Sequence, residues 1–401
     1  MASQGNGVSR LGSLPPRSVA LILGTRPELI KAAPVIKALG ESGVLIHTGQ
    51  HFDEGLSGSF IRELGISEPI ASLRVGGLSR AGQIGTGVER LEEILMSVQP
   101  KAVVVHGDTN ATLSGALAAN ALHMPLVHME AGLRSFDRRM PEEHNRVVVD
   151  HLADLCCAPT DVNHANLSAE GINGGRVVVT GNTIVEAVKA HMPPAAERRR
   201  MVADMGLTPS RFVVATMHRP ENVDSPGPLR VILEALVDQG MPVLFAAHPR
   251  TTRAIDRFGL RALASRLRLI KPMSYGHFLA ASAEAALLVS DSGGVQEEAS
   301  IVKRPVIVVR RSTERPEGLG TFSQLHAPDE KLADSIATAL ESAHETKQEL
   351  AKLPTPYGDR YSSTRIAGAI AALVQLYETH TTPGSESITA DLLEAQSWAA
   401  V

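Results

Sequence analysis

A strand–loop–helix unit recurs along this chain and constrains its fold more than any other feature. In the first half, short apolar runs at 17–23, 44–48, 101–105, 125–128 and 176–180 each end in a polar or glycine-containing turn. Most of these turns lead into a segment whose apolar residues recur at helical spacing. This alternation is typical of a doubly wound parallel sheet covered by helices on both faces. In such sheets the ligand site lies just past the carboxyl ends of the strands.

A second set of the same units follows a break at residues 191–209. The break holds Pro193-Pro194 and the charged run Glu197–Arg200, which we interpret as a solvated linker or a surface helix. The apolar runs that resume the pattern lie at 211–216, 243–247, 267–270, 283–290 and 305–309. A chain of 401 residues is also long for a single core. We therefore expect an α/β protein with two Rossmann-like doubly wound domains that face a central cleft.

The domain boundaries follow from this division. We expect an N-terminal domain over residues 18–190 and a C-terminal domain over residues 195–360. A helix at 361–378, with a strong apolar side, is expected to join the first domain. The polar ends, residues 1–17 and 379–401, are expected to be mobile tails, with a short helix near 390–399 in the second of them.

Composition excludes several classes of function. The net charge is −4 and aromatic residues make up 3%, so neither a basic surface nor a base-stacking platform for nucleic acid is indicated. No apolar run has the length of a membrane span. Residues 1–18 lack the apolar segment of a secretory signal, and the two cysteines, Cys156 and Cys157, are adjacent and suit a reduced compartment. We expect a cytoplasmic protein that contacts neither nucleic acid nor membrane.

Metal and cofactor motifs are absent from the sequence. The adjacent cysteines have no further Cys or His at zinc-finger spacing, so we expect no metal site. No Gly-x-Gly-x-x-Gly motif follows a strand, and no phosphate-binding loop ends in Gly-Lys-Ser/Thr. We therefore expect no cofactor.

The stretch Asp291–Ala299 points to an anion site. An apolar run precedes it, two glycines open it, and a helical run follows. A strand, a glycine turn and a helix start together present free backbone N–H groups to a phosphate. Glu297 and Glu298 are expected in the first turn of that helix, one of them placed to meet sugar hydroxyls. The stretch thus predicts a site for a phosphorylated sugar nucleotide.

Several acidic residues follow strand ends in the first half. Asp108 and Glu130 come directly after strands, and Glu142 and Glu143 lie in the loop after the second of these. Each could simply cap or begin a helix. Together they favour a site where a base and an acid face each other across a substrate.

Basic residues occupy comparable positions. Arg26 and Arg315 lie in tight proline-containing turns at strand ends, where a diphosphate would find charge-assisted partners. His218 directly follows another strand beside Arg219. A structural role and a ligand-contacting role for His218 both stay open at this point.

A set of short motifs lies in order between about residues 20 and 370, namely Gly24-Thr-Arg-Pro-Glu28 with Lys31, Thr48-Gly-Gln-His51, His106-Gly-Asp-Thr109, His128–Arg134, Pro141–Arg146, Gly181-Asn-Thr183, His218–Asn222, Asp291–Glu298 and Thr313–Glu317. This set resembles the non-hydrolysing UDP-N-acetylglucosamine 2-epimerase family. The resemblance implies a GT-B-like fold in which the second domain holds UDP.

The resemblance also implies roles for single residues. Catalysis would rest on residues that match the family's functional positions, which are Asp108, Glu130, Glu142, His218 and Lys31. Binding of UDP and substrate would rest on Arg26, Ser292, Gly293, Gly294, Glu298 and Arg315. Glu298 would meet the ribose hydroxyls, and Ser292 with the two glycines would meet the diphosphate.

The implied reaction converts UDP-GlcNAc to UDP-ManNAc without a cofactor. A carboxylate removes the C2 proton while UDP leaves C1, and UDP then adds back to the resulting 2-acetamidoglucal. The UDP-sugar is the expected partner, and we expect a homodimer. Some members of the family also bind a second UDP-GlcNAc as an allosteric activator, and that partner stays open here.

Four other functions share parts of this pattern. A hydrolysing relative would release free N-acetylmannosamine and UDP. His248-Pro-Arg-Thr251 occurs in a subgroup that includes epimerases for UDP-2,3-diacetamido sugar acids, so another UDP-acetamido sugar stays open as the substrate. A GT-B glycosyltransferase needs no set of carboxylates at C2, and an inactive sugar-nucleotide sensor needs no complete catalytic set.

Overall fold

The chain forms two structural units. The computed structural model describes residues 14–50 and 60–380. Of these residues, the first unit comprises 14–50, 60–133, 138–183 and 359–380, and the second comprises Arg134–Asp137 and Ile184–Gly358.

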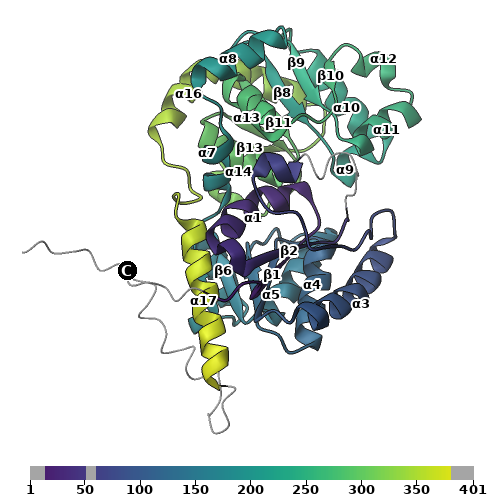
Figure 1. Ribbon diagram of the computed structural model, residues 1–401. Helices are drawn as coiled ribbons and strands as arrows, with labels where there is room; N and C mark the ends of the chain where they lie inside the picture. Colours follow the sequence, from purple (N-terminus) through teal and green to yellow (C-terminus); the bar gives the residue numbers. More distant parts are fainter. Residues whose placement is uncertain (1–13, 51–59, 381–401) are drawn as a thin grey trace, which may run out of the picture. The chain divides into compact units, whose positions relative to one another are not determined.

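The described part of the first unit is built on one seven-stranded parallel sheet (Figure 1). Its strands are β1 (Val19–Leu23), β2 (Gly43–His47), β3 (Ala71–Ser72), β4 (Ala102–His106), β5 (Leu126–Met129), β6 (Leu155–Ala158) and β7 (Val177–Val179). They lie in the order β3-β2-β1-β4-β5-β6-β7. The chain therefore reverses its direction of growth between β1 and β4, and ligands of such sheets bind at that point.

Helices cover both faces of this sheet, so its central strands are buried throughout. The helices are α1 (Arg26–Leu39), a turn at 60–64, α3 (Arg80–Val98), α4 (Asn110–Ala121), α5 (Pro141–Leu152), α6 (Asp161–Ala169) and α17 (Ser362–His380), with 3-10 turns η1 (Gly40–Ser42) and η2 (Gly174–Arg176). Every residue of β1 and of β4 is buried, which explains their uninterrupted apolar sequences. Helix α17 packs against α1, so the last described helix belongs to the first unit.

The described part of the second unit holds a six-stranded parallel sheet in the order β10-β9-β8-β11-β12-β13. Its strands are β8 (Val213–Thr216), β9 (Val243–Ala246), β10 (Arg268–Ile270), β11 (Leu287–Ser290), β12 (Val306–Val309) and β13 (Ser323–His326). The reversal point lies between β8 and β11. The loops after these two strands carry His218 and Asp291.

The helices of the second unit follow the same plan. They are α7 (Ile184–His191), α8 (Ala195–Asp204), α9 (Pro220–Val223), α10 (Pro226–Val237), α11 (Pro249–Arg257), α12 (Arg261–Ala264), α13 (Tyr275–Glu284), α14 (Gly293–Val302), α15 (Leu332–Glu341) and α16 (Ala343–Lys352), with the 3-10 turn η3 (Pro316–Gly318).

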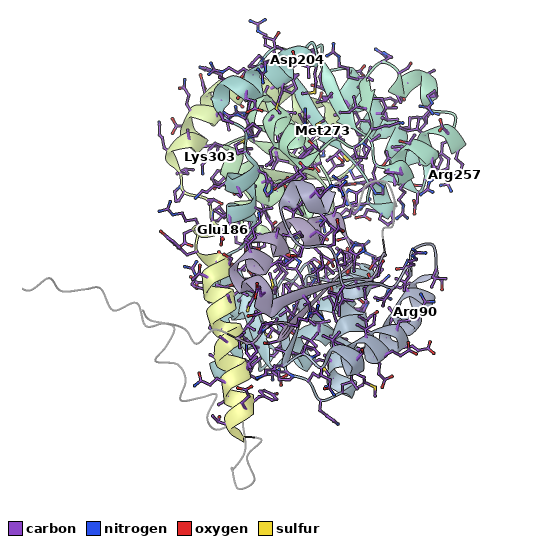
Figure 2. The ribbon with its side chains drawn as sticks, in the orientation of Figure 1. Arg90, Glu186, Asp204, Arg257, Met273 and Lys303 are labelled. Carbon is purple, nitrogen blue, oxygen red and sulfur yellow. The ribbon has the colours of Figure 1, made fainter. Side chains whose placement is uncertain are left out.

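Helix α14 ends at Lys303, its C-cap residue, which is labelled in Figure 2. The backbone of Lys303 is left-handed, with φ at 59°. Its Nζ donates a hydrogen bond to the Leu353 carbonyl at 2.7 Å.

Three strands of the described residues were not predicted from the sequence, and the first is the two-residue edge strand β3, which is too short to show a period. The apolar spacing of residues 147–155 predicts one helix. In the structure, α5 begins at Pro141 and ends at Leu152, and β6 begins at Leu155 with both cysteines inside the sheet. The four apolar residues of β6 continue the apolar pattern of the helix before them, so they show no strand periodicity of their own. The third missed strand, β13, is the polar edge strand Ser-Gln-Leu-His, whose sequence is that of a loop. The short helix expected near 390–399 lies outside the described residues.

Among residues 14–50 and 60–380, none of the helices combines the length and the apolarity that a membrane span requires. In the same ranges, no group of three or more His, Cys, Asp or Glu side chains is arranged to hold a metal ion.

Candidate active site

Glu130 is held in an unusual conformation at the end of β5. Its φ is +64°, a left-handed conformation that costs a non-glycine residue roughly 1–2 kcal/mol. The carboxylate forms an ion pair with Lys31 of α1 and accepts a hydrogen bond from Asn182 Nδ2 at 3.0 Å. The side chains of Lys31 and Glu130 are 4% and 8% exposed. The fold therefore stabilises a charged, nearly buried pair at the reversal point of the first sheet.

His106 lies beside this pair as a neutral imidazole. Its Nε2 is 3.8 Å from Glu130 Oε2, and neither ring nitrogen has a hydrogen-bond partner among the described residues. Burial is the main cause that lowers the pKa of His106 to about 4. The imidazole thus borders the Lys31–Glu130 pair without adding a charge at neutral pH.

Asp108 follows β4 and pairs with Arg146. Arg146 lies on α5, is 1% exposed, and contacts both Asp108 and Glu143, the second at 2.7 Å. Asn145, also on α5, donates to the Asp108 backbone carbonyl at 2.9 Å. The predicted residues Asp108 and Glu143 are therefore joined through an arginine that the sequence analysis did not single out.

Glu142 differs from these carboxylates in its surroundings. It lies in the first turn of α5 and is partly exposed. Among the described residues, no hydrogen bond or ion pair engages its side chain. Of the predicted acidic residues, Glu142 can therefore take up or release a proton without breaking an ion pair.

Glu28 ties two of the predicted loops together. Its carboxylate accepts the backbone N–H groups of Gly24 and Thr25 at 2.6 and 2.7 Å and the Thr109 hydroxyl at 2.6 Å. Gly24 and Thr25 follow β1, and Thr109 follows Asp108. Burial is the largest influence on this carboxyl and raises its pKa to about 7, against the lowering effect of these hydrogen bonds.

A titration of Glu28 should show this displaced pKa directly. We expect its carboxyl ¹³C signal to titrate near pH 7. Because the pKa is raised in the folded protein, the stability that this proton contributes is full below about pH 4.5 and lost as the pH rises through about 7, roughly 3 kcal/mol in all. The unfolding temperature of Glu28→Gln should therefore rise relative to wild type between pH 4.5 and 7.5. Titration near pH 4.5, or parallel pH profiles of the two proteins, would contradict the assignment.

In the second unit, Asp291 orients His218. The buried Asp291 carboxylate accepts the backbone N–H groups of His218 and Arg219 at 3.0 and 2.9 Å, and His218 Nδ1 lies 3.0 Å from its Oδ1. Burial alone would raise the pKa of Asp291, but the His218 charge and the N–H donors outweigh burial and lower it to about 2. With Nδ1 directed at Asp291, Nε2 of the 39%-exposed imidazole is the atom left for a ligand.

The two glycines of the predicted anion site begin α14. Ser292 is the N-cap, and the helix starts at Gly293. Glu297 and Glu298 therefore lie in the second turn and not in the first, because both glycines are helical. The first backbone N–H groups of this helix have no partner within the helix, so the predicted phosphate contact stays a prediction.

Gly293 is required by its contact with Arg315. A Cβ on Gly293 would lie 2.6 Å from Arg315 Nη1, and one on Gly294 would lie no closer than 3.8 Å to any group, the Ser292 hydroxyl. Arg315 Nε is 2.6 Å from Glu297, and its Nη1 pairs with Glu314. The arginine thus supports the glycine turn, which adds a structural role to the predicted phosphate contact.

Glu298 and Arg26, two further predicted residues, each contact an aromatic side chain. Glu298 is 6% exposed and accepts a hydrogen bond from the Tyr275 hydroxyl at 3.0 Å. Burial raises the pKa of Tyr275 well above 10, so the hydroxyl stays a donor. Arg26 is partly buried in the first turn of α1, with its guanidinium 4.2 Å from the centre of the Phe60 ring.

Comparison with known proteins identifies the family of the chain. A family model described as UDP-N-acetylglucosamine 2-epimerase matches residues 37–371. The chain belongs to the UDP-N-acetylglucosamine 2-epimerase family.

Individual relatives agree with this assignment. The UDP-N-acetylglucosamine 2-epimerase of Methanocaldococcus jannaschii is 37% identical over 362 residues, 87% of this chain and 97% of that protein. Its crystal structure in complex with UDP-GlcNAc and UDP has a TM-score of 0.80 and covers 88% of this chain and 99% of its own. The UDP-2,3-diacetamido-2,3-dideoxy-D-glucuronate 2-epimerase of Pseudomonas aeruginosa is 35% identical over 88% of this chain and 99% of that protein.

Family membership and the two parallel sheets confirm the predicted GT-B-like α/β fold class with two Rossmann-like domains. The roles predicted for single side chains of this epimerase-family protein stay predictions. The structure brings Lys31 together with Glu130, and Asp108 together with Glu143 through Arg146, within the first unit.

Sequence reasoning missed the residues that orient the predicted ones. For Arg146 a signal existed, because Glu143 and Arg146 are three apart on a helix and such pairs meet. For Asp291 the signal was its place next to Ser292 in the anion motif, but its partners lie more than 70 residues earlier. Long-range partners of this kind cannot be read from local spacing.

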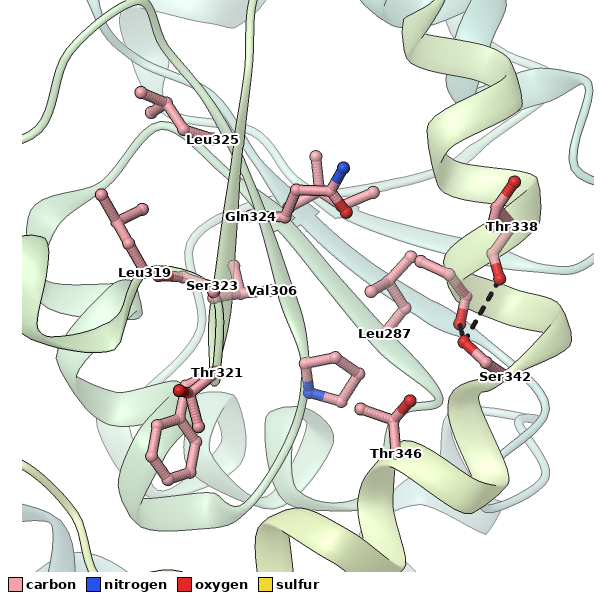
Figure 3. Close-up of a pocket in the computed structure, with 15 residues that line it drawn as sticks. Leu287, Val306, Leu319, Thr321, Ser323, Gln324, Leu325, Thr338, Ser342 and Thr346 are labelled. Atoms are coloured by element: carbon pink, nitrogen blue, oxygen red, sulfur yellow. Dashed lines mark hydrogen bonds between the residues drawn. The ribbon is translucent and has the colours of Figure 1, made fainter.

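The second unit holds a cavity of about 470 Å³, and Figure 3 shows the residues that line it. It opens at the amino-terminal ends of β11 and β12, beside β13 and helices α15 and α16, and its lining includes Leu287, Val306 and Ser342. The predicted residues of this unit follow the carboxyl ends of the strands, and none of them lines the cavity. We therefore place no part of the candidate active site there.

Proposed function

We propose that the protein interconverts UDP-GlcNAc and UDP-ManNAc by inverting the configuration at C2. One observation supports this function most, namely the different surroundings of three carboxylates in the first unit. Asp108 is paired with Arg146 and Glu130 with Lys31, whereas Glu142 has no partner within residues 14–50 and 60–380. Inversion at C2 requires proton removal on one face and proton delivery on the other, and carboxylates in contrasting environments suit the two tasks.

The reaction proceeds by elimination and re-addition. As a carboxylate takes the C2 proton, the C2–H electron pair forms a C1–C2 double bond and the C1–O bond breaks with its electrons going to UDP. Glu142 is the group that can exchange this proton, and Asp108 and Glu130 complete the acid–base set. UDP then adds back to C1 of the 2-acetamidoglucal while C2 is protonated from the opposite face.

The second unit holds UDP during both stages. The α14 N-terminus and His218 Nε2 face the diphosphate, and Glu298, held by Tyr275, meets the ribose hydroxyls. Arg26 of the first unit supplies a further positive charge. Positive groups at the diphosphate stabilise the charge that grows as UDP leaves, so they speed the elimination as well as bind the substrate. Retention of UDP makes the reaction non-hydrolysing.

A second substrate is favoured by one of the relatives. The P. aeruginosa protein acts, by its name, on UDP-2,3-diacetamido-2,3-dideoxy-D-glucuronate and is nearly as similar to this chain as the M. jannaschii enzyme. The same residues would invert C2 of that sugar acid. A cytoplasmic homodimer is also part of the proposal, and light scattering that gives the mass of a single chain would contradict the dimer.

Incubation of the purified protein with each UDP-sugar, followed by ¹H and ³¹P NMR, tests the function. We expect UDP-GlcNAc to yield UDP-ManNAc up to a fixed equilibrium ratio, with no steady growth of free UDP. Stoichiometric free UDP and free N-acetylmannosamine would show the hydrolysing reaction instead. Conversion of the diacetamido sugar acid alone would assign the second substrate, and conversion of neither sugar would refute 2-epimerisation of these substrates.

A further inference from the structure

His128 forms a fully buried link between three parts of the first unit. It lies on β5 and is 0% exposed. Its Nδ1 is 2.6 Å from Asp150 Oδ1, and its Nε2 is 2.8 Å from the carbonyl oxygen of Gly107. Asp150 lies on α5, is also 0% exposed, and accepts the backbone N–H of Gly132 at 3.1 Å.

Each end of this link adjoins a predicted catalytic residue. Gly107 directly precedes Asp108, and Gly132 lies two residues after Glu130. Residues at the ends of β4 and β5 are in register, with Val105 opposite His128 and His106 opposite Met129. Helix α5, which carries Asp150, also carries Glu142 and Arg146. One pair of side chains thus reaches both loops and the helix of the carboxylate set.

The hydrogen bonds of the pair fix which atom of the ring meets each neighbour. The Gly107 carbonyl is an acceptor, so Nε2 carries the hydrogen that it donates there, and Nδ1 is left to bond the Asp150 carboxyl. A buried, hydrogen-bonded pair of this kind is often no more stabilising than apolar residues of the same volume. General stability therefore does not account for it, whereas the fixed placement of two loops does.

We propose that His128 and Asp150 are positioning residues that set the places of Asp108 and Glu130 for the C2 reaction. They touch neither substrate nor reacting atoms, and they act through the Gly107 carbonyl and the Gly132 N–H. This inference rests on the proposed function. A displacement of about 1 Å at a reacting group costs roughly 10²-fold in rate, so loss of the link should lower kcat and leave substrate binding intact.

Variants that also carry Asp150→Asn separate the effect of the hydrogen bonds from the effect of the Asp150 carboxyl group. The Asp150→Asn substitution removes the buried carboxyl group, yet the new amide can still accept from Gly132 and donate to His128 Nδ1, while the ring keeps its Nε2–H for Gly107. In that background, His128→Gln extends an amide to the place of Nε2, and His128→Asn reaches only the place of Nδ1. The matched pair therefore differs in the hydrogen bond that it keeps, because the Gln amide reaches Gly107 and the Asn amide reaches residue 150 instead.

We expect Asp150→Asn and H128Q/D150N to keep kcat within about fivefold of wild type, and H128N/D150N to lose roughly 10²-fold with KM and UDP affinity unchanged. Equal kcat in the Gln and Asn variants would overturn the proposal, and so would a 10²-fold loss in Asp150→Asn itself. If H128N/D150N does not fold, H128F/D150N, which fills the ring volume, takes its place in the same comparison.

Amide hydrogen exchange provides a readout that needs no activity. We expect exchange at residues 107–109 and 130–132 to speed up in H128N/D150N and to stay at the Asp150→Asn level in H128Q/D150N. Identical exchange in the two double variants would contradict the positioning role even if the wild type proved to act on another sugar. Failure of the wild type to epimerise, with the expected exchange difference, would refute the proposed function alone.

Discussion

Glu142→Gln is expected to lower turnover roughly 10³-fold, because a neutral amide cannot take up the C2 proton. Glu142 has no partner among the described residues, so the substitution breaks no hydrogen bond or ion pair there. The unfolding temperature should therefore stay within about 1 °C of wild type. UDP affinity should also be unchanged, since Glu142 is not among the residues proposed to contact UDP. Initial rates, differential scanning calorimetry and UDP titration calorimetry measure the three quantities.

Asp108→Asn serves as the comparison for this variant. It too should lose most turnover, but it also weakens a pair that holds Arg146, which is 1% exposed. Loss of a charged hydrogen bond costs about 2 kcal/mol, or about 4–8 °C in unfolding temperature. Turnover within tenfold of wild type in Glu142→Gln would remove Glu142 from the acid–base set. An equal drop in unfolding temperature in both variants would show that Glu142 has a structural partner.

Gly293→Ala is expected to lower UDP affinity roughly 10²-fold, which corresponds to about 3 kcal/mol. The new Cβ would lie 2.6 Å from Arg315 Nη1 and 2.9 Å from Glu314 Oε1, so the guanidinium must move. That movement disturbs the buried pairs of Arg315 with Glu297 and Glu314 and displaces the start of α14. Titration calorimetry with UDP measures the loss.

Gly294→Ala is the matched control for this prediction. Its Cβ would lie 3.8 Å from the Ser292 hydroxyl, an ordinary contact, and alanine keeps the backbone N–H. Alanine also favours a helix over glycine by about 1 kcal/mol, so stability should not fall. UDP affinity of Gly294→Ala should stay within about threefold of wild type. Equal affinities of the two variants would contradict the placement of the diphosphate at this helix start.

The parts of the fold that could be predicted are those with local signals. Strands β1 and β4 are buried on both faces, so they are continuous apolar runs, and the apolar run before the two glycines of α14 is the strand β11. Strand β13 was missed because an edge strand needs no apolar face, and its sequence is mostly polar.

In the candidate site, too, some features have a local sequence signal and others have none. Asp108, Glu130 and His218 could be found because they follow strand ends, where parallel sheets place ligand sites. Their orientation could not, because it depends on partners far away in the sequence, such as Asn182 for Glu130 and Asp291 for His218. The left-handed φ of Glu130 is likewise set by tertiary contacts, since glutamate does not favour it locally.

Proton exchange at C2 tests the central claim most directly. The protein is incubated with UDP-GlcNAc in heavy water, and the sugar signals are followed by NMR. Elimination and re-addition through Asp108, Glu130 and Glu142 predicts that deuterium enters C2 of both UDP-GlcNAc and the newly formed UDP-ManNAc, and that Glu142→Gln slows its entry. UDP-ManNAc that retains hydrogen at C2, or binding of UDP-GlcNAc without any exchange, would contradict the account.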